Sequence, residues 1–269
     1  MITQSQRSSR EILLLLVALA LVGSVCGTLW YFTRPSTMQL DPEGKWRSGD
    51  RLARLLLGPE QIACYCCGVW AGFILLRREL EVRRQRQAFQ MDLVPTDEGS
   101  RILPEDSRPL LRKMDQHVAR KGPFVLVNML RLALGKYAIS HSAPDVGEVV
   151  RTQADVEMGR MVSSMSTVQY LAWAIPAIGF VGTVRGLAGS FTMASSQEEN
   201  LAKFMDDATK HLNFAFDCTL VALVLSLIVM YLLHTVQRDE ETLIIDCQQY
   251  CQEHLLLRLY DPKPEPVLQ

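Results

Sequence analysis

The chain has 269 residues, of which 48% are hydrophobic, and its formal net charge at pH 7 is −1. Such a balanced charge excludes a large basic surface for nucleic acid. The apolar residues are gathered into blocks with the charged residues between them, which is typical of a polytopic membrane protein.

Seven cysteines are present, and five of them fall inside apolar blocks, where a cysteine acts as a small hydrophobe. Cys247 and Cys251 lie one helical turn apart, but two ligands without a matching second pair do not make a metal site. A disulfide framework is equally unsupported. We therefore expect no metal and no cofactor.

The first predicted membrane helix covers residues 12–32, which carry no charge and follow Arg7 and Arg10. A cleaved signal peptide is the competing interpretation. The apolar run is longer than a usual signal-peptide core, and the residues before Cys26 fit neither a small-x-small nor a lipoprotein cleavage site. We expect a permanent transmembrane helix, followed by a polar loop over 33–57.

The second predicted membrane helix, about 61–76, is shorter and ends at an arginine cluster that begins with Arg77 and Arg78. Lys and Arg are enriched on the cytoplasmic side of membranes, so the cluster predicts that this helix ends in the cytoplasm. The loop before the helix carries five Lys and Arg residues of its own, which is an opposing signal.

A helical cytoplasmic insert is predicted for residues 77–165. Two helices, about 109–121 and 124–141, are separated by Gly122-Pro123, which breaks a helix. No nucleotide-binding glycine loop, catalytic-triad spacing or His/Cys cluster occurs here, so we do not expect an enzyme. From Asp145 a helical pattern runs without a breaker into the next apolar block.

The third and fourth predicted membrane helices cover about 167–191 and 211–236, with an outer turn over 192–210 between them. A polar helix continues from 238 to 259. The expected organisation of this all-α polytopic membrane protein is four spans with both termini in the cytoplasm and helices 3 and 4 extended into it. Its segments are a hairpin (1–76), the insert (77–165), a second hairpin (166–236) and a cytoplasmic helix with a tail (237–269).

Small and weakly polar residues recur every three or four positions along the third helix, so they share one face of it. Such a stripe lets another helix backbone approach closely, or it lines a narrow passage. The stripe consists of Pro176, Gly179, Gly182, Thr183, Gly186 and Ser190.

Two threonines are predicted to lie at the same depth in the membrane. Thr183 and Thr219 are mirror images about residue 201, the middle of the connecting turn, and Ser226 shares a helical face with Thr219. Hydroxyls at one level can relay a proton or help a partly dehydrated ion across. The alternative is that each hydroxyl bonds back to a carbonyl of its own helix.

Two motifs carry a resemblance to a known family. The stretch PAIGFVGTVRGL is similar to the third-helix signature of the MotA/TolQ/ExbB proton-channel family, and AFDCTLVAL resembles the pattern around the threonine of its last helix. The similarity covers mainly residues 145–236. Four spans with a large insert are closer to the flagellar-stator branch than to the three-span TolQ and ExbB branch.

The resemblance implies a homopentamer in the bacterial inner membrane that surrounds two single-span subunits of the ExbD, TolR or MotB kind. Each partner brings an aspartate that is protonated and released as ions flow, so the complex is a 5:2 motor. Carried onto this chain, the ion pathway contains Thr183 and Thr219, with Ser226 as a further candidate. The close-packing wall contains Gly179, Gly182 and Gly186, and Pro176 forms a kink.

Two positions depart from the family pattern. TolQ and ExbB relatives carry a glutamate about five residues before the fourth-helix threonine, where this chain has Phe214, and it has Asp217 instead, two before Thr219. Arg185 follows Thr183 by two and mirrors Asp217 about residue 201. We predict an intramembrane ion pair between Arg185 and Asp217, within or between subunits. The alternative is that Arg185 snorkels to the outer surface while Asp217 sits in a wet vestibule.

Two other functions stay open at this point. A non-conducting scaffold of the same fold is one, and a transporter, for which internal repeats are expected and none is found, is the weaker one. The process that the motor drives is not encoded in these motifs. Cys218, in place of a second threonine before Thr219, favours protons over sodium.

Overall fold

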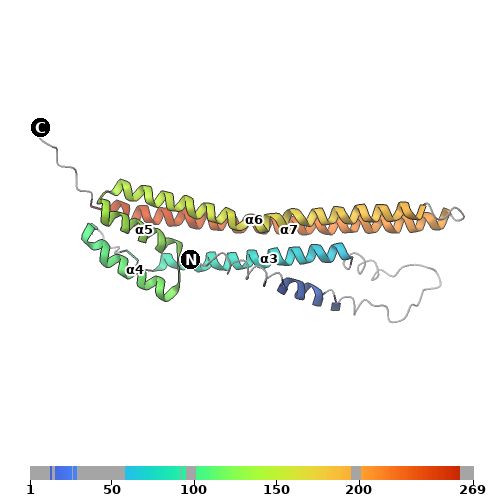
Figure 1. Ribbon diagram of the computed structural model, residues 1–269, viewed down its shortest axis with the longest axis horizontal. Coiled ribbons are helices and arrows are strands. Elements are labelled where there is room, and N and C mark those ends of the chain that lie inside the picture. Colours follow the sequence, from blue (N-terminus) through green and yellow to red (C-terminus); the bar gives the residue numbers. More distant parts are fainter. Residues whose placement is uncertain are drawn as a thin grey trace, which may run out of the picture. The chain divides into compact units, whose positions relative to one another are not determined.

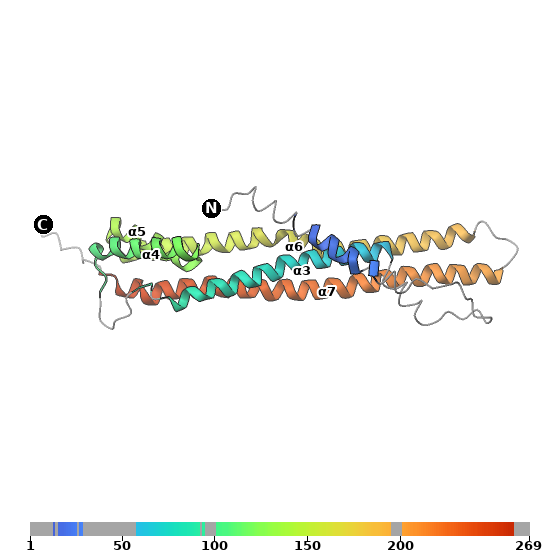
Figure 2. The ribbon, with the colours of Figure 1, turned by 90° about the horizontal axis from the view of Figure 1, so that it is seen from below.

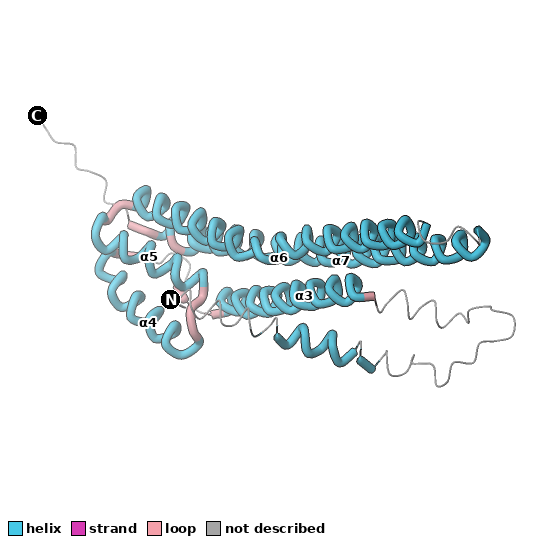
Figure 3. Tube along the Cα trace, turned by 45° about the vertical axis from the view of Figure 1, so that its right-hand side comes forward, coloured by secondary structure: helices cyan, strands magenta, loops and turns pink. Residues whose placement is uncertain are grey.

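The computed structural model describes residues 13, 16–25, 27–28, 58–91, 93–94, 101–194 and 201–260. Throughout these ranges the regular elements are helices, joined by short loops, and a single isolated β-bridge pairs Ile102 with Leu259 (Figure 3). The predicted all-α class is confirmed.

In the described part of the chain, three helices are long and apolar enough to cross a membrane: α3 (Pro59–Arg86), α6 (Ala143–Ala194) and α7 (Leu201–His254). The chain is therefore a multi-pass membrane protein. Of the predicted first span, 12–32, the structure describes residues 13, 16–25 and 27–28, which include a short apolar helix over Leu16–Val25. A membrane span over 12–32, and with it a total of four spans, stays a prediction.

The connection between α6 and α7 is shorter than the turn predicted over 192–210. Helix α6 continues to Ala194 and α7 already begins at Leu201. The sequence LAKFMDDATK at the start of α7 contains good helix formers and neither glycine nor proline, so nothing in it ends a helix. An exposed polar helix carries the same residues as a polar turn, so polarity alone does not predict the length of this connection.

The chain divides into two compact units, residues 1–77 with 166–234 and residues 78–165 with 235–269. In the first unit α6 and α7 lie side by side and run in opposite directions, and the first part of α3 packs beside them (Figures 1 and 2). Gly68 of α3 shows how close this packing is, since a Cβ there would lie 2.9 Å from the side chain of Leu225.

The second unit has an apolar core of its own. Around this core lie α4 (Ser107–Lys121), α5 (Val125–Ser140), the 3₁₀ turns Gln87–Gln90, Pro104–Asp106 and Leu256–Arg258, and the adjoining ends of the three long helices. Tyr137 is fully buried, and its hydroxyl lies 2.8 Å from the carbonyl of Tyr260 and 3.1 Å from that of Ile102. These hydrogen bonds hold the segment around Tyr260, which follows α7, against this core.

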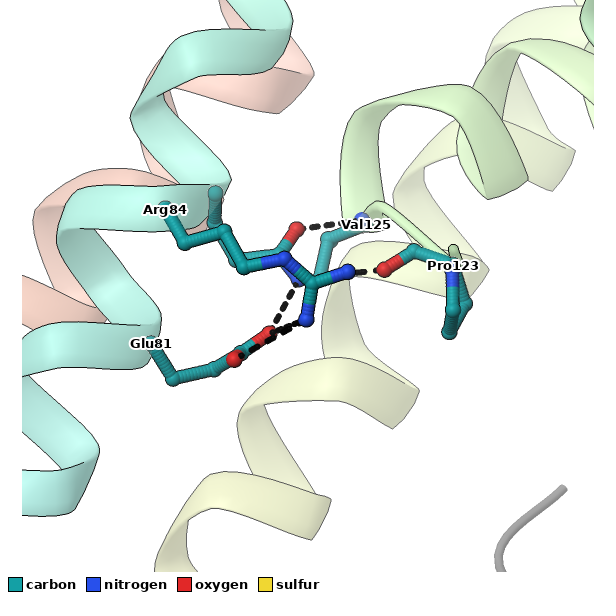
Figure 4. Close-up of polar contacts among 5 residues, drawn as sticks. Glu81, Arg84, Pro123 and Val125 are labelled. Atoms are coloured by element: carbon teal, nitrogen blue, oxygen red, sulfur yellow. Dashed lines mark hydrogen bonds and ion pairs between the residues drawn. The ribbon is translucent and has the colours of Figure 1, made fainter. Parts of the chain in front are cut away.

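Gln85 and Arg84 of α3 hold the loop between α4 and α5, and Figure 4 shows Arg84 beside this loop. The Gln85 carboxamide donates to the carbonyl of Pro123 at 3.2 Å and accepts from the N–H of Val125 at 2.9 Å, the first residue of α5. Gly122 precedes this contact at φ 90° and ψ 179°, a conformation that is nearly restricted to glycine. The predicted break at Gly122-Pro123 is therefore a tight, backbone-specified corner.

Candidate functional site

The small-residue stripe of α6 faces α7 at Gly179 and Gly182. A Cβ at Gly179 would lie 2.5 Å from the Cβ of Ala222 and 3.5 Å from the Cα of Thr219. A Cβ at Gly182 would collide with the Sγ of Cys218. The two backbones can come this close only because neither glycine has a side chain.

The two predicted pathway threonines meet at one backbone atom. The Thr183 hydroxyl lies 3.5 Å from the carbonyl oxygen of Ala215 on α7, and the Thr219 hydroxyl lies 3.2 Å from the same oxygen. They are therefore at one level, as their mirror positions indicate. Each hydroxyl also has an acceptor in its own helix, Gly179 for Thr183 at 3.2 Å and Phe216 for Thr219 at 3.0 Å.

Ser226 of α7 forms a hydrogen bond to the backbone of α6. Pro176 lacks an N–H, so the carbonyl of Ala172 four residues earlier loses its helical hydrogen bond. The Ser226 hydroxyl of α7 donates to that carbonyl at 3.1 Å, and both residues are buried. The serine thus satisfies the group that the proline leaves free. Its place in an ion pathway stays a prediction.

Arg185 has a partner different from the predicted one. Its guanidinium forms an ion pair with the carboxylate of Glu60 in the first turn of α3: Nη1 lies 2.9 Å from Oε1, and Nη2 donates a hydrogen bond to Oε2 at 2.9 Å. It also lies 5.7 Å from the ring centre of Phe214 on α7. Within the chain Glu60 therefore takes the role predicted for Asp217, and an Arg185–Asp217 pair between subunits stays a prediction.

The reason for this difference is the azimuth of the two side chains. Mirror positions in an antiparallel hairpin fix the depth of a residue but not the side of the helix from which it projects. Asp217 is half-buried on α7, whereas the neighbouring Cys218 is the residue that meets α6 at Gly182. The Cγ of Glu60 reaches the same place, 3.3 Å from a Cβ at Gly182. Gly186, the glycine that follows Gly182 in the stripe, is buried.

Among the described residues of this unit, Gln61, next to Glu60, is the most deeply buried polar side chain. It has 0% exposure, and neither atom of its carboxamide has a hydrogen-bond partner among these residues. Leaving such a group unpaired costs about 1–3 kcal/mol. A Cβ at Gly58 would collide with the Oε1 of Gln61 and would lie 3.0 Å from the Phe214 ring. Polar groups of α3 therefore extend beyond the ion pair into the same packed region.

Sequence reasoning missed Glu60 and the bond of Ser226, for different reasons. Glu60 lies between the predicted loop (33–57) and the predicted second helix (about 61–76), and a contact across 125 positions leaves no trace in the periodicity of either helix. Ser226 had a usable signal, because positions 176 and 226 are also mirror images about residue 201. A proline in one membrane helix and a hydroxyl at the mirrored position of the next predict this bond.

In the described part of the chain, no three His, Cys, Asp or Glu side chains gather closely enough to hold a metal ion. The site consists of hydroxyls, backbone carbonyls and one ion pair. Such groups can carry a proton or coordinate a small cation.

Comparisons with known proteins bear on this hairpin directly. No curated protein matches the chain. The model of the MotA/TolQ/ExbB proton channel family matches residues 121–249, which contain both threonines, the glycine stripe and Arg185. The resemblance stated from PAIGFVGTVRGL and AFDCTLVAL is therefore confirmed, and this region of the chain belongs to the MotA/TolQ/ExbB proton channel family.

Proposed function

We propose that the chain is the pentamer-forming subunit of a proton-driven 5:2 motor of the bacterial inner membrane. Five copies would surround two single-span partners of the ExbD, TolR or MotB kind, with α6 and α7 as the inner ring. Ion flow past the partner's aspartate would drive the partner's movement. One charge that moves through 100 mV releases about 2.3 kcal/mol, which is enough to bias a conformational step.

The observation that carries the proposal is the meeting of Thr183 and Thr219 at the carbonyl of Ala215. This meeting puts three oxygen atoms from two helices at one level of a helix pair that belongs to a proton-channel family. A threonine hydroxyl that donates to a carbonyl keeps its lone pairs for a passing proton or cation. In this arrangement the glycines keep the wall thin, and the hydroxyls give it polarity.

The apolar side chains that this unit leaves uncovered are consistent with a ring embedded in lipid. Large hydrophobic side chains on α6 and α7 are more than half exposed in the single chain, and exposed apolar surface on this scale marks contact with lipid or with other subunits. They include Trp173, Phe180, Val181, Val184, Phe216, Leu220, Leu227 and Tyr231.

The test is ion flux in vesicles that contain the chain with its partner, for the wild type and for Thr183→Val and Thr219→Val. Valine keeps the shape of threonine and removes the hydroxyl. Loss of about one hydrogen bond to the moving ion raises its barrier enough for a roughly tenfold slower flux. Thr242→Val is the matched control, because Thr242 also bonds back to its own helix, at 2.8 Å to Arg238, and lies in the second unit. Unchanged flux in both membrane variants would refute the pathway assignment.

A non-conducting scaffold is the second candidate, and one observation favours it. Each threonine hydroxyl has a carbonyl of its own helix as an acceptor, which is what a purely structural threonine does in a membrane. A scaffold predicts no partner-dependent flux in the wild type, and no neighbouring gene for a single-span protein with an aspartate early in its span.

A further inference from the structure

We propose that Glu60 is a specificity-determining residue of the ion pathway: its carboxylate neutralises Arg185, whose charge would otherwise exclude cations from the α6–α7 wall. This inference rests on the proposed function and adds a residue from α3, outside the family-matched region 121–249, to the conducting machinery.

The first step is the position of the positive charge. Arg185 follows Thr183 by two residues in α6, so its guanidinium belongs to the same turn of the helix as the threonine level. An arginine stays protonated at any pH that the protein meets. A fixed positive charge beside a narrow passage repels protons and metal cations, which is how some channels exclude them. A cation pathway at this level therefore requires that the charge be compensated.

The second step is the geometry of the compensation. Glu60 meets both outer nitrogens of Arg185 at 2.9 Å, the forked arrangement in which a guanidinium and a carboxylate match best. The Glu60 side chain is only 9% exposed, and its Cγ reaches the Gly182 position, one residue before Thr183. The carboxylate is thus built into the packing of α3 against α6 and α7, and its position does not depend on a mobile surface side chain.

The third step is what happens when the carboxylate is lost. The Arg185 side chain is 55% exposed, and it also lies over the Phe214 ring, which attracts a cation. The guanidinium therefore keeps a favourable location without Glu60. Among the described residues Glu60 is the carboxylate that pairs with Arg185, so removing it leaves this positive charge at the threonine level without that counter-charge. Removing Arg185 instead removes the positive charge itself. The two neutralising substitutions should have opposite consequences for flux.

The experiment compares Glu60→Gln, Arg185→Gln and the double variant, each co-expressed with the partner. Partner-dependent flux is measured in vesicles, and the assembled complex is measured by its size after purification. We expect Glu60→Gln to assemble and to lose flux about tenfold or more, because like charges repel strongly at the effective dielectric of a protein site. Arg185→Gln should conduct, and the double variant should regain the flux that Glu60→Gln loses.

Three results would overturn the inference. The first is normal flux in Glu60→Gln, the second is an equal loss of flux in Arg185→Gln, and the third is an assembled double variant that stays silent. If Glu60→Gln does not assemble, Arg185→Gln and the double variant decide the role of Glu60. Both variants conduct if Glu60 acts as a counter-charge to Arg185, and they do not conduct if the ion pair only holds the helices together. Failure of the proposed function gives a separate pattern, in which the wild type itself shows no flux or the threonine variants conduct normally.

Discussion

At the scale of single residues, Gly179 marks the tightest described approach of the α6 backbone to a rigid atom of α7. The atom in its way is the Cβ of Ala222, which is itself buried and cannot turn aside as a long side chain can. At Gly182 the opposing atom is the sulfur of Cys218, and a rotation of that side chain can move it. Gly179 is therefore the residue at which the close-packing interpretation is tested most directly.

We expect Gly179→Ala to destabilise the helix pair by about 1–3 kcal/mol, because an added methyl group in a packed interface forces the backbones apart. The measurement is the thermal unfolding midpoint of the purified complex in detergent. Gly72→Ala is the matched control, since Gly72 lies in α3 of the same unit and a Cβ there would meet nothing within 4 Å. The double variant Gly179→Ala with Ala222→Gly exchanges the methyl group across the interface and should recover most of the loss. No difference between the two single variants would contradict the assignment.

At the scale of elements, α6 and α7 are far longer than a bilayer requires. They have 52 and 54 residues, which at 1.5 Å per residue is roughly 80 Å, against about 30 Å of hydrocarbon. A helix of this length with a proline inside it must satisfy the carbonyl that the proline leaves free. In α6 that proline is Pro176, and the hydroxyl of Ser226 on the neighbouring helix donates a hydrogen bond to the free carbonyl.

We predict that Ser226→Ala costs about 1 kcal/mol of stability in the wild-type chain, because the Ala172 carbonyl is then buried without a donor. In a Pro176→Ala background the same substitution should cost little, since the alanine N–H restores the helical bond to Ala172. The measurement is a double-mutant cycle on the thermal unfolding of the purified complex. An equal loss of stability in both backgrounds would show that the serine does not act through the Ala172 carbonyl, and it would favour a role of Ser226 in the ion pathway.

These elements also show what a sequence can and cannot predict. The long helices, the corner at Gly122-Pro123 and the common level of Thr183 and Thr219 follow from apolar runs, breakers and counting from one turn. The ion pair does not follow, because it joins α3 to α6 across 125 positions that include α4 and α5, and no turn links the two helices from which their relative depth could be counted. Depth in a hairpin can be counted along the sequence, whereas the facing of a side chain depends on helix rotation, and only packing fixes that rotation.

At the scale of the whole molecule, the direction in which α7 crosses the membrane is open to a direct test. The arginine cluster after the second predicted span indicates that Arg77 and Arg78 are cytoplasmic, and therefore that the connection between α6 and α7 is outside. Two exposed positions near opposite ends of α7 report on this topology. Met205 is 58% exposed near its start, and Leu257 is 82% exposed just beyond its end.

We expect Met205→Cys to react with a membrane-impermeant maleimide in intact spheroplasts, and Leu257→Cys to react only after the membrane is permeabilised. The physical reason is that α7 is long and apolar enough to cross the bilayer, so its two ends lie in different compartments. The parent chain gives the background from its own cysteines, and permeabilised cells show that both introduced thiols are reactive. The reverse pattern would invert the topology and would place Thr183 and Thr219 in a helix pair that opens toward the cytoplasm. Labelling of both positions in intact spheroplasts would mean that α7 does not cross, and the ion pathway along it would be lost.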